Sequence, residues 1–235
     1  LVYSSFNLDK ELTKVDPVEA LNSGKFTKDD IGKTVYLSNS YSPCQEWVIA
    51  DVNHDNTVGA VDLFCKYTLS KSRTDYVRFK ITSTIDDEST DYSLSSLRYY
   101  LNNTIYNGFT DTIKNAMIPI QIIFTRRKDY STVSISDKLK CPSLAELAFE
   151  GNGNVSRCNT PYPLFGTPQN GENNYNELVR LYSPEHTYTN YWTRDSDSYY
   201  HIYYIGCNSA GGKYFNKSYA NEYGCVPAAF IRFGK

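Results

Sequence analysis

The chain has 235 residues, enough to bury a substantial core in one large domain or in two small ones. Its 24 basic and 26 acidic residues give a formal net charge of −2, which argues against a nucleic-acid partner. The sequence contains no run of about 18 apolar residues, so we expect no membrane insertion.

The N-terminal part is predicted to hold a connector followed by three strands. Residues 1–30 are assigned to the connector and residues 31–235 to a ligand-binding domain. Within the connector, Pro17 follows an acidic residue, which favours a short helix over residues 17–22. Runs of β-branched and aromatic residues predict strands over residues 34–37, 47–52 and 61–67.

The turn between the second and third of these strands is rich in oxygen ligands. Asp51, Asn53 and Asp55 alternate along it, and Asp62 stands at the twelfth position, which is the spacing of a calcium loop and resembles half of a dockerin. However, Asn56 stands where glycine usually makes the sharp turn, and strands flank the segment. The alternative is a polar hairpin tip whose side chains bond to their own turn. We expect that folding requires no metal or other cofactor.

Two helices are predicted over residues 93–105 and 110–117. Ser93 and Thr110 provide the N-caps. The first helix has apolar residues at helical spacing, namely Leu94, Leu97, Leu101 and Ile105. Both helices are therefore expected to face the core.

The middle of the chain is predicted to change from regular structure to long loops. Residues 120–124 form a strand, and Ser143 with Glu146 has the spacing of a capping box for a short helix through Phe149. Residues 150–190 are rich in glycine, asparagine and proline. Such long loops within a domain are usually functional or disordered.

The six cysteines leave two possibilities open. In a secreted protein they could form three disulfides, for which 15 pairings exist. Free buried thiols are the alternative, because the chain is not small and has no close pair of cysteines. Zinc binding is not expected, because no histidine flanks these residues at ligand spacing. The cysteines are Cys44, Cys65, Cys141, Cys158, Cys207 and Cys225.

Residues 191–230 combine many tyrosines with serine, asparagine, aspartate, glycine and histidine. This mixture suits a recognition surface, since tyrosine offers a large contact area at low entropic cost and the small polar residues adapt their hydrogen bonds. Trp192 and Pro227 belong to the expected framework at its two ends. The alternative is a tyrosine-rich sheet without a ligand.

The same segment resembles C-type-lectin-like domains of the formylglycine-generating-enzyme-like branch. The resemblance rests on residues 191–194 (Tyr-Trp-Thr-Arg), on Gly206 and on residues 224–228 (Gly-Cys-Val-Pro-Ala). The chain departs from the pattern at Val226, where such closing segments usually carry arginine. The branch includes the variable proteins of diversity-generating retroelements, and the segment also resembles uncharacterised surface domains of gut bacteria and their phages.

The resemblance implies an α+β, C-type-lectin-like fold, with two helices packed on a small twisted antiparallel sheet and with long irregular loops. It also implies a phage virion or bacterial surface protein that binds an extracellular protein or glycan, and a homo-oligomer such as a trimer. The ligand-binding residues would be Tyr199, Tyr200, His201, Tyr203, Tyr204, Asn208, Tyr214, Asn216, Tyr219, Asn221 and Tyr223.

The sequence gives no pattern that predicts an enzyme. Cys207 and Cys225 lie outside the closely spaced cysteine pair of formylglycine-generating enzymes, and no histidine stands in a recognised catalytic frame. The alternative functions are a glycan hydrolase using Asp195, Asp197 or Glu222, or a purely structural surface component. Aromatic residues at this density favour binding.

Overall fold

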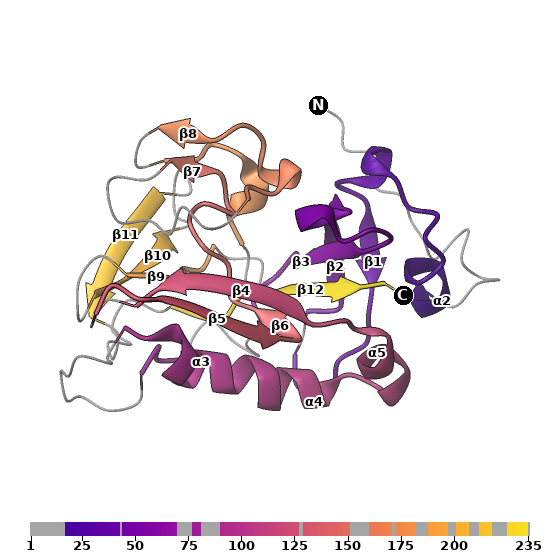
Figure 1. Cartoon of the computed structure of the whole chain (residues 1–235), viewed down its shortest axis with the longest axis horizontal. Helices are drawn as coiled ribbons and strands as arrows, with labels where there is room; N and C mark the ends of the chain where they lie inside the picture. Colours follow the sequence, from indigo (N-terminus) through magenta and orange to yellow (C-terminus); the bar gives the residue numbers. More distant parts are fainter. Residues whose placement is uncertain are drawn as a thin grey trace.

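Long-range strand pairing gives the molecule a mixed α+β architecture with mostly antiparallel sheets, as Figure 1 shows. The computed structural model describes residues 17–42, 44–69, 77–80, 90–126, 129–150, 160–170, 173–181, 188–196, 201–206, 212–217 and 225–234. These residues form one five-stranded sheet, one three-stranded sheet and two pairs of strands. No helix among them is long and apolar enough to cross a membrane.

The five-stranded sheet brings the two halves of the chain together. Its order is β1 (Thr34–Tyr36), β2 (Glu46–Val52), β3 (Val61–Cys65), β12 (Phe230–Phe233) and β6 (Leu139–Lys140), and all its pairs are antiparallel. Every residue of β3 and β12 is buried. The last strand is therefore inserted between two earlier ones and completes the core.

The predicted first helix exists, with a different start. A short 3-10 turn, η3 (Tyr92–Leu94), precedes a helical run made of α3 (Ser96–Tyr99), the π segment η4 (Tyr100–Ile105) and α4 (Tyr106–Gly108). Ser95 caps this run, rather than the predicted Ser93, since its hydroxyl accepts a bond from the amide of residue 98 at 3.0 Å. The predicted core positions after Leu94 are buried, whereas Leu94 lies before the cap and is exposed.

An amide side chain of the helical run bonds to the edge strand of the five-stranded sheet. Asn102 donates to the carbonyl of Leu139 at 2.9 Å and accepts from its amide at 3.0 Å. The second predicted helix is confirmed as α5 (Asp111–Ala116), capped by Thr110. It contacts α2 (Pro17–Leu21), whose Val18 and Leu21 are buried in the core. The end of the predicted connector is therefore packed against the domain.

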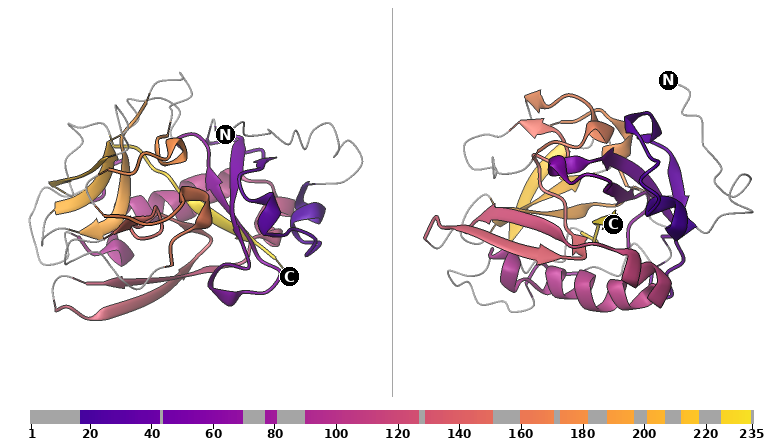
Figure 2. Two further views of the ribbon diagram at one scale, coloured as in Figure 1. Left: turned by 90° about the horizontal axis from the view of Figure 1, so that it is seen from above. Right: turned by 45° about the vertical axis from the view of Figure 1, so that its right-hand side comes forward.

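Further strands extend from this core. The hairpin of β4 (Ile120–Thr125) and β5 (Thr132–Asp137) projects from it in Figure 2, and β7 (Phe149–Glu150) pairs in parallel with β8 (Gln169–Asn170). The three-stranded sheet contains β9 (Tyr191–Ser196), β10 (His201–Gly206) and β11 (Gly212–Lys217), with β10 in the middle. The remaining 3-10 turns are η1 (Lys28–Asp30), η2 (His54–Asn56), η5 (Pro163–Phe165) and η6 (Glu177–Val179).

The helix predicted at residues 143–149 is wrong, although its cap forms. The Ser143 hydroxyl accepts from the Glu146 amide at 3.2 Å, and the Glu146 carboxylate accepts from the Ser143 amide at 2.9 Å. One turn follows, after which Ala148 adopts a φ of 59° and the chain enters β7. This left-handed backbone conformation ends the helix before it can extend.

Candidate functional site

A row of aromatic side chains crosses the three-stranded sheet from the buried strand β9 to the outer strand β11. Tyr204 of β10 stands opposite Trp192 of β9 and opposite Tyr214 of β11. The Tyr204 ring meets Trp192 edge-on at 6.2 Å and stacks on Tyr214 at 5.7 Å between centroids. Directly opposite residues share a face of a sheet, so the three rings form one continuous surface.

Exposure increases along this aromatic row. Trp192 is buried, Tyr204 is half-buried against the core, and Tyr214 is 48% exposed. Trp192 is fixed from behind, because its indole nitrogen donates to the carbonyl of Val77 at 2.6 Å and its ring meets Phe79 edge-on at 6.4 Å. The core therefore holds one end of the row rigid, while the other end is presented to solvent.

The other predicted ligand-binding residues that the structure describes differ in how deeply they are buried. Tyr203 is only 9% exposed and belongs to the core, so the expectation that it lies on an exposed face is wrong. Successive side chains of a strand point to opposite faces of the sheet, and Tyr203 faces away from its half-buried neighbour Tyr204. His201 is half-buried at the start of β10. Asn216 stands opposite Ile202, and its side chain lies outside the description.

The predicted face extends beyond the described residues. Tyr199, Tyr200, Asn208, Tyr219, Asn221 and Tyr223 lie outside the described residues. They fall in the connections that follow β9, β10 and β11 along the chain. Their contribution to a ligand site stays a prediction.

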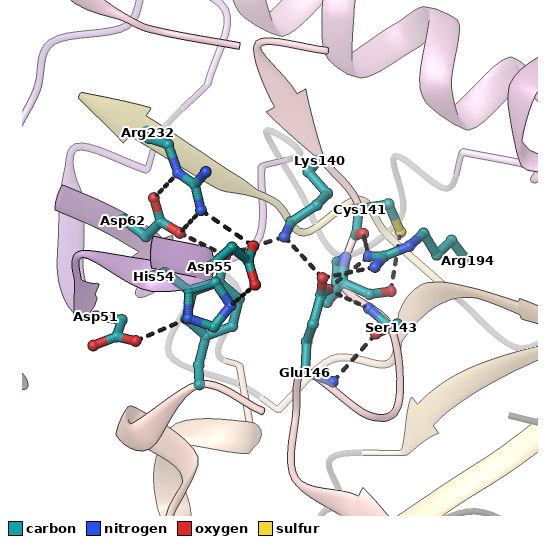
Figure 3. A network of polar contacts seen from close by, with 12 residues as sticks. Asp51, His54, Asp55, Asp62, Lys140, Cys141, Ser143, Glu146, Arg194 and Arg232 are labelled. Carbon is teal, nitrogen blue, oxygen red and sulfur yellow. Dashed lines mark hydrogen bonds and ion pairs between the residues drawn. The ribbon is translucent and has the colours of Figure 1, made fainter. Parts of the chain in front are cut away.

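A buried ionic cluster, drawn in Figure 3, includes Arg194, which follows Trp192 by two residues in β9. Arg194 of β9 donates two hydrogen bonds to the Glu146 carboxylate, both at 2.6 Å. The Lys140 ammonium of β6 lies 2.8 Å from the same carboxylate. Each of these side chains is at most 2% exposed. Buried charges require such pairing, because an unpaired ion in the interior is very costly.

The cluster continues across the five-stranded sheet. Lys140 donates to the Tyr162 hydroxyl at 3.1 Å, and this hydroxyl donates to Asp62 of β3 at 2.7 Å. Asp62 also accepts from Arg232 of β12 at 2.7 Å. We call the connected side chains the ionic cluster: Asp62, Lys140, Glu146, Tyr162, Arg194 and Arg232. It joins both sheets.

Burial and neighbouring charges shift the pKa values of residues in the ionic cluster. Burial alone would raise the pKa of Glu146, but Arg194 and Lys140 outweigh it and hold this pKa well below its usual range. Burial lowers the pKa of Lys140. Burial, reinforced by the neighbouring Asp62, raises the pKa of Tyr162. These shifts keep Glu146 ionised as the shared partner of two cations.

One family model covers most of this architecture. The model for a domain of unknown function (DUF6273) matches residues 72–232, which is more than half of the chain. The chain belongs to the DUF6273 family. No curated protein and no solved structure matches it. The matched segment of this DUF6273 domain starts after β3, and Asp62 on that strand binds Arg232 at its end. The preceding strands are therefore part of the same core.

The calcium-loop alternative does not fit the side chains of this DUF6273 domain. Asp51 accepts from Lys28 and contacts His54 at 2.8 Å, while Asp62 is bound to Arg232. The Asn53 side chain accepts from the Gly59 amide at 2.7 Å, as expected for a polar hairpin tip. Asp55 faces His54 at 3.5 Å. Over the described ranges, no three His, Cys, Asp or Glu side chains group together to hold a metal.

The described cysteines are buried and form no disulfide with one another: Cys44, Cys65, Cys141 and Cys225. Burial raises the pKa of Cys44 to about 12 and raises the pKa of Cys65 and Cys141 as well. Thiols in such surroundings are poor nucleophiles. Cys158 and Cys207 lie outside the described residues.

Of the carboxylates considered for glycan hydrolysis, the structure describes only Asp195. Asp195 is buried and accepts a hydrogen bond from the amide of Leu144, so it supports the turn before β7. Asp197 and Glu222 lie outside the described residues. The ionic cluster was not predicted from the sequence. Arg194 belongs to the segment that carries the family resemblance and Glu146 to the predicted capping box, but nothing in the sequence showed that they pair.

Proposed function

We propose that this DUF6273 domain is a non-enzymatic binding module with a C-type-lectin-like fold. Two features support the fold proposal. The C-terminal strand β12 lies between β3 and β6 of the main sheet, and a separate three-stranded sheet contains Tyr191, Tyr204 and Tyr214. Both features are compatible with the α+β fold and antiparallel sheet that the resemblance of residues 191–194 and 224–228 implies.

The observation that carries the functional proposal is the aromatic row. A tyrosine held rigid by its neighbours loses little entropy on binding, and its ring offers apolar contact and an electron-rich face. Tyr214 has this position, because Tyr204 supports its ring and Trp192 supports Tyr204. Such a ring suits an extracellular protein or a glycan, whose C–H groups pack on aromatic faces.

We place the module on the surface of a phage virion or a bacterial cell. The partner would be a protein or glycan on a host or neighbouring cell, and the chain would act as a homo-oligomer, specifically a trimer. Both proposals rest on the family resemblance of the C-terminal segment. Mass photometry of the purified chain tests the trimer directly.

The binding proposal is tested with fluorescently labelled protein on a glycan array and on a panel of bacterial cells. We expect saturable binding that Tyr214→Ala weakens roughly 30-fold, the equivalent of about 2 kcal/mol for an aromatic anchor. The matched control is Tyr99→Ala, which removes another exposed ring (68%) on α3. Equal binding by both variants, or binding to none of these surfaces, would contradict the proposal.

A further inference from the structure

A cavity of about 250 Å³ opens between the five-stranded sheet and the segment around η5 and η6. None of the three rings of the aromatic row lines it, so it is separate from the candidate binding face. Its lining is largely apolar and includes Val48, Phe64, Leu164, Leu178 and Leu181. Water in such a cavity finds few hydrogen-bond partners, so an apolar group that displaces it gains free energy.

The side of the cavity that the sheet provides is held rigid by the core. Val48 and Phe64 stand directly opposite each other on β2 and β3, so their side chains share one face of the sheet. The Phe64 ring meets Phe165 edge-on at 5.2 Å and lies 4.7 Å from Phe230 between centroids. Both of these neighbouring rings are buried. A ligand therefore meets a surface that is already formed, and binding does not have to order these side chains.

The charged groups at the cavity are already paired. Among the described residues, its lining includes Lys66, Arg180 and Glu177. Lys66 forms an ion pair with Glu46 at 2.5 Å, and Arg180 forms one with Glu177 at 3.3 Å. Arg180 also packs over the Tyr188 ring, with its guanidinium carbon 4.8 Å from the ring centre. Two cations face two carboxylates, so these pairs favour neither an anion nor a cation as ligand.

A charged ligand would enter this cavity at a cost. Moving an ion from water to an apolar surface is unfavourable unless the ion finds a partner, and Lys66 and Arg180 already have theirs. We propose that the cavity binds a small uncharged molecule with an apolar body, namely an aromatic ring with a short chain. A cavity of about 150 Å³ is sufficient for benzene, so this larger one accommodates the ring and its chain. The ring would contact Phe64 and the leucines. This proposal and that for the aromatic row do not depend on each other.

The probe is 2-phenylethanol, compared with phenylacetate and 2-phenylethylammonium, which carry the same ring with a negative or a positive charge. Titrations of the full chain followed by its NMR signals measure all three affinities. We expect the alcohol to bind with a Kd on the order of 1 mM, and both ions to bind at least about tenfold more weakly. The shifted signals should include the methyl groups of Leu164, Leu178 and Leu181.

Filling the cavity should abolish binding. Leu178→Trp adds a bulky ring to the lining, whereas the matched control Leu94→Trp adds the same ring at an exposed position and should leave the affinity unchanged. If Leu178→Trp does not fold, the methyl signals of the wild type decide where the probe binds. The proposal is overturned if the alcohol does not bind saturably, if either ion binds as tightly as the alcohol, if the shifted signals lie elsewhere, or if a folded Leu178→Trp variant still binds.

Discussion

The ionic cluster and the aromatic row occupy neighbouring strands but are built in opposite ways. In the cluster, Arg194 and Glu146 are buried and bonded on several sides, so any change leaves a charge without its partner. In the row, side chains become more exposed from Trp192 to Tyr214, so its outer end can change at little cost. The comparison contrasts a fixed interior, shared by both sheets, with an exposed strand whose surface tolerates substitution.

Removing the shared carboxylate should have the largest effect on this comparison. Glu146→Gln leaves the Arg194 and Lys140 charges without their common partner in the interior. We expect the free energy of unfolding to fall by about 3–5 kcal/mol, measured by urea denaturation at neutral pH. Glu177→Gln, at an exposed ion pair, should change it by less than about 0.5 kcal/mol. A similar loss in both variants would show that the cluster has no special role.

Low pH should have the second largest effect on stability, because it weakens the ionic cluster. The pKa of Glu146 is lower in the folded state than its ordinary value of about 4.3. Below about pH 4.3 the unfolded chain therefore binds a proton that the folded chain does not, and stability falls as the pH falls. Urea denaturation at several pH values should show this slope, and Glu146→Gln should make it shallower. An unchanged slope in the variant would place the acid sensitivity elsewhere.

A helix cap outside both the ionic cluster and the aromatic row should have an effect of intermediate size on stability. The Thr110 hydroxyl accepts from the Ile113 amide at the start of α5. Thr110→Ala should cost about 1 kcal/mol, between the values for the cluster and for the exposed end of the row. Thr112→Ala, at an exposed position of the same helix, should stay within about 0.5 kcal/mol. Urea denaturation of both variants decides whether the cap contributes.

The smallest effect is expected from metal removal. The carboxylates of Asp51 and Asp62 already face cationic side chains, so we expect the hairpin between β2 and β3 to fold without calcium. Excess EDTA should leave the melting temperature unchanged within error. A large decrease would mean that a bound metal stabilises the native state by mass action.

Local elements were predictable because their signals are local. The leucine spacing and the Thr110 cap located both helices, and β-branched runs located β2, β3 and β4. The ionic cluster was not predictable, because Arg194 and Glu146 are 48 positions apart and meet only after β6 and β9 are placed.

Only part of the candidate binding face could be predicted, because burial also depends on contacts between distant segments. The sequence shows how dense the tyrosines are but not which of them a sheet covers. Tyr203 and Tyr204 are adjacent, yet one belongs to the core and the other supports the exposed ring of Tyr214. Successive side chains of β10 point to opposite faces of the sheet, so the two tyrosines separate only once the packing of each face is known.

The most direct test compares two tyrosines of the same sheet. Urea denaturation of Tyr203→Ala should show a loss of about 3 kcal/mol or more, because a buried aromatic side chain is removed. Tyr214→Ala should lose no more than about 1 kcal/mol, the contribution of its stacking on Tyr204, while losing binding in the array and cell measurements. Equal losses of stability, or full binding by a stable Tyr214→Ala variant, would contradict the division between a fixed interior and a displayed face.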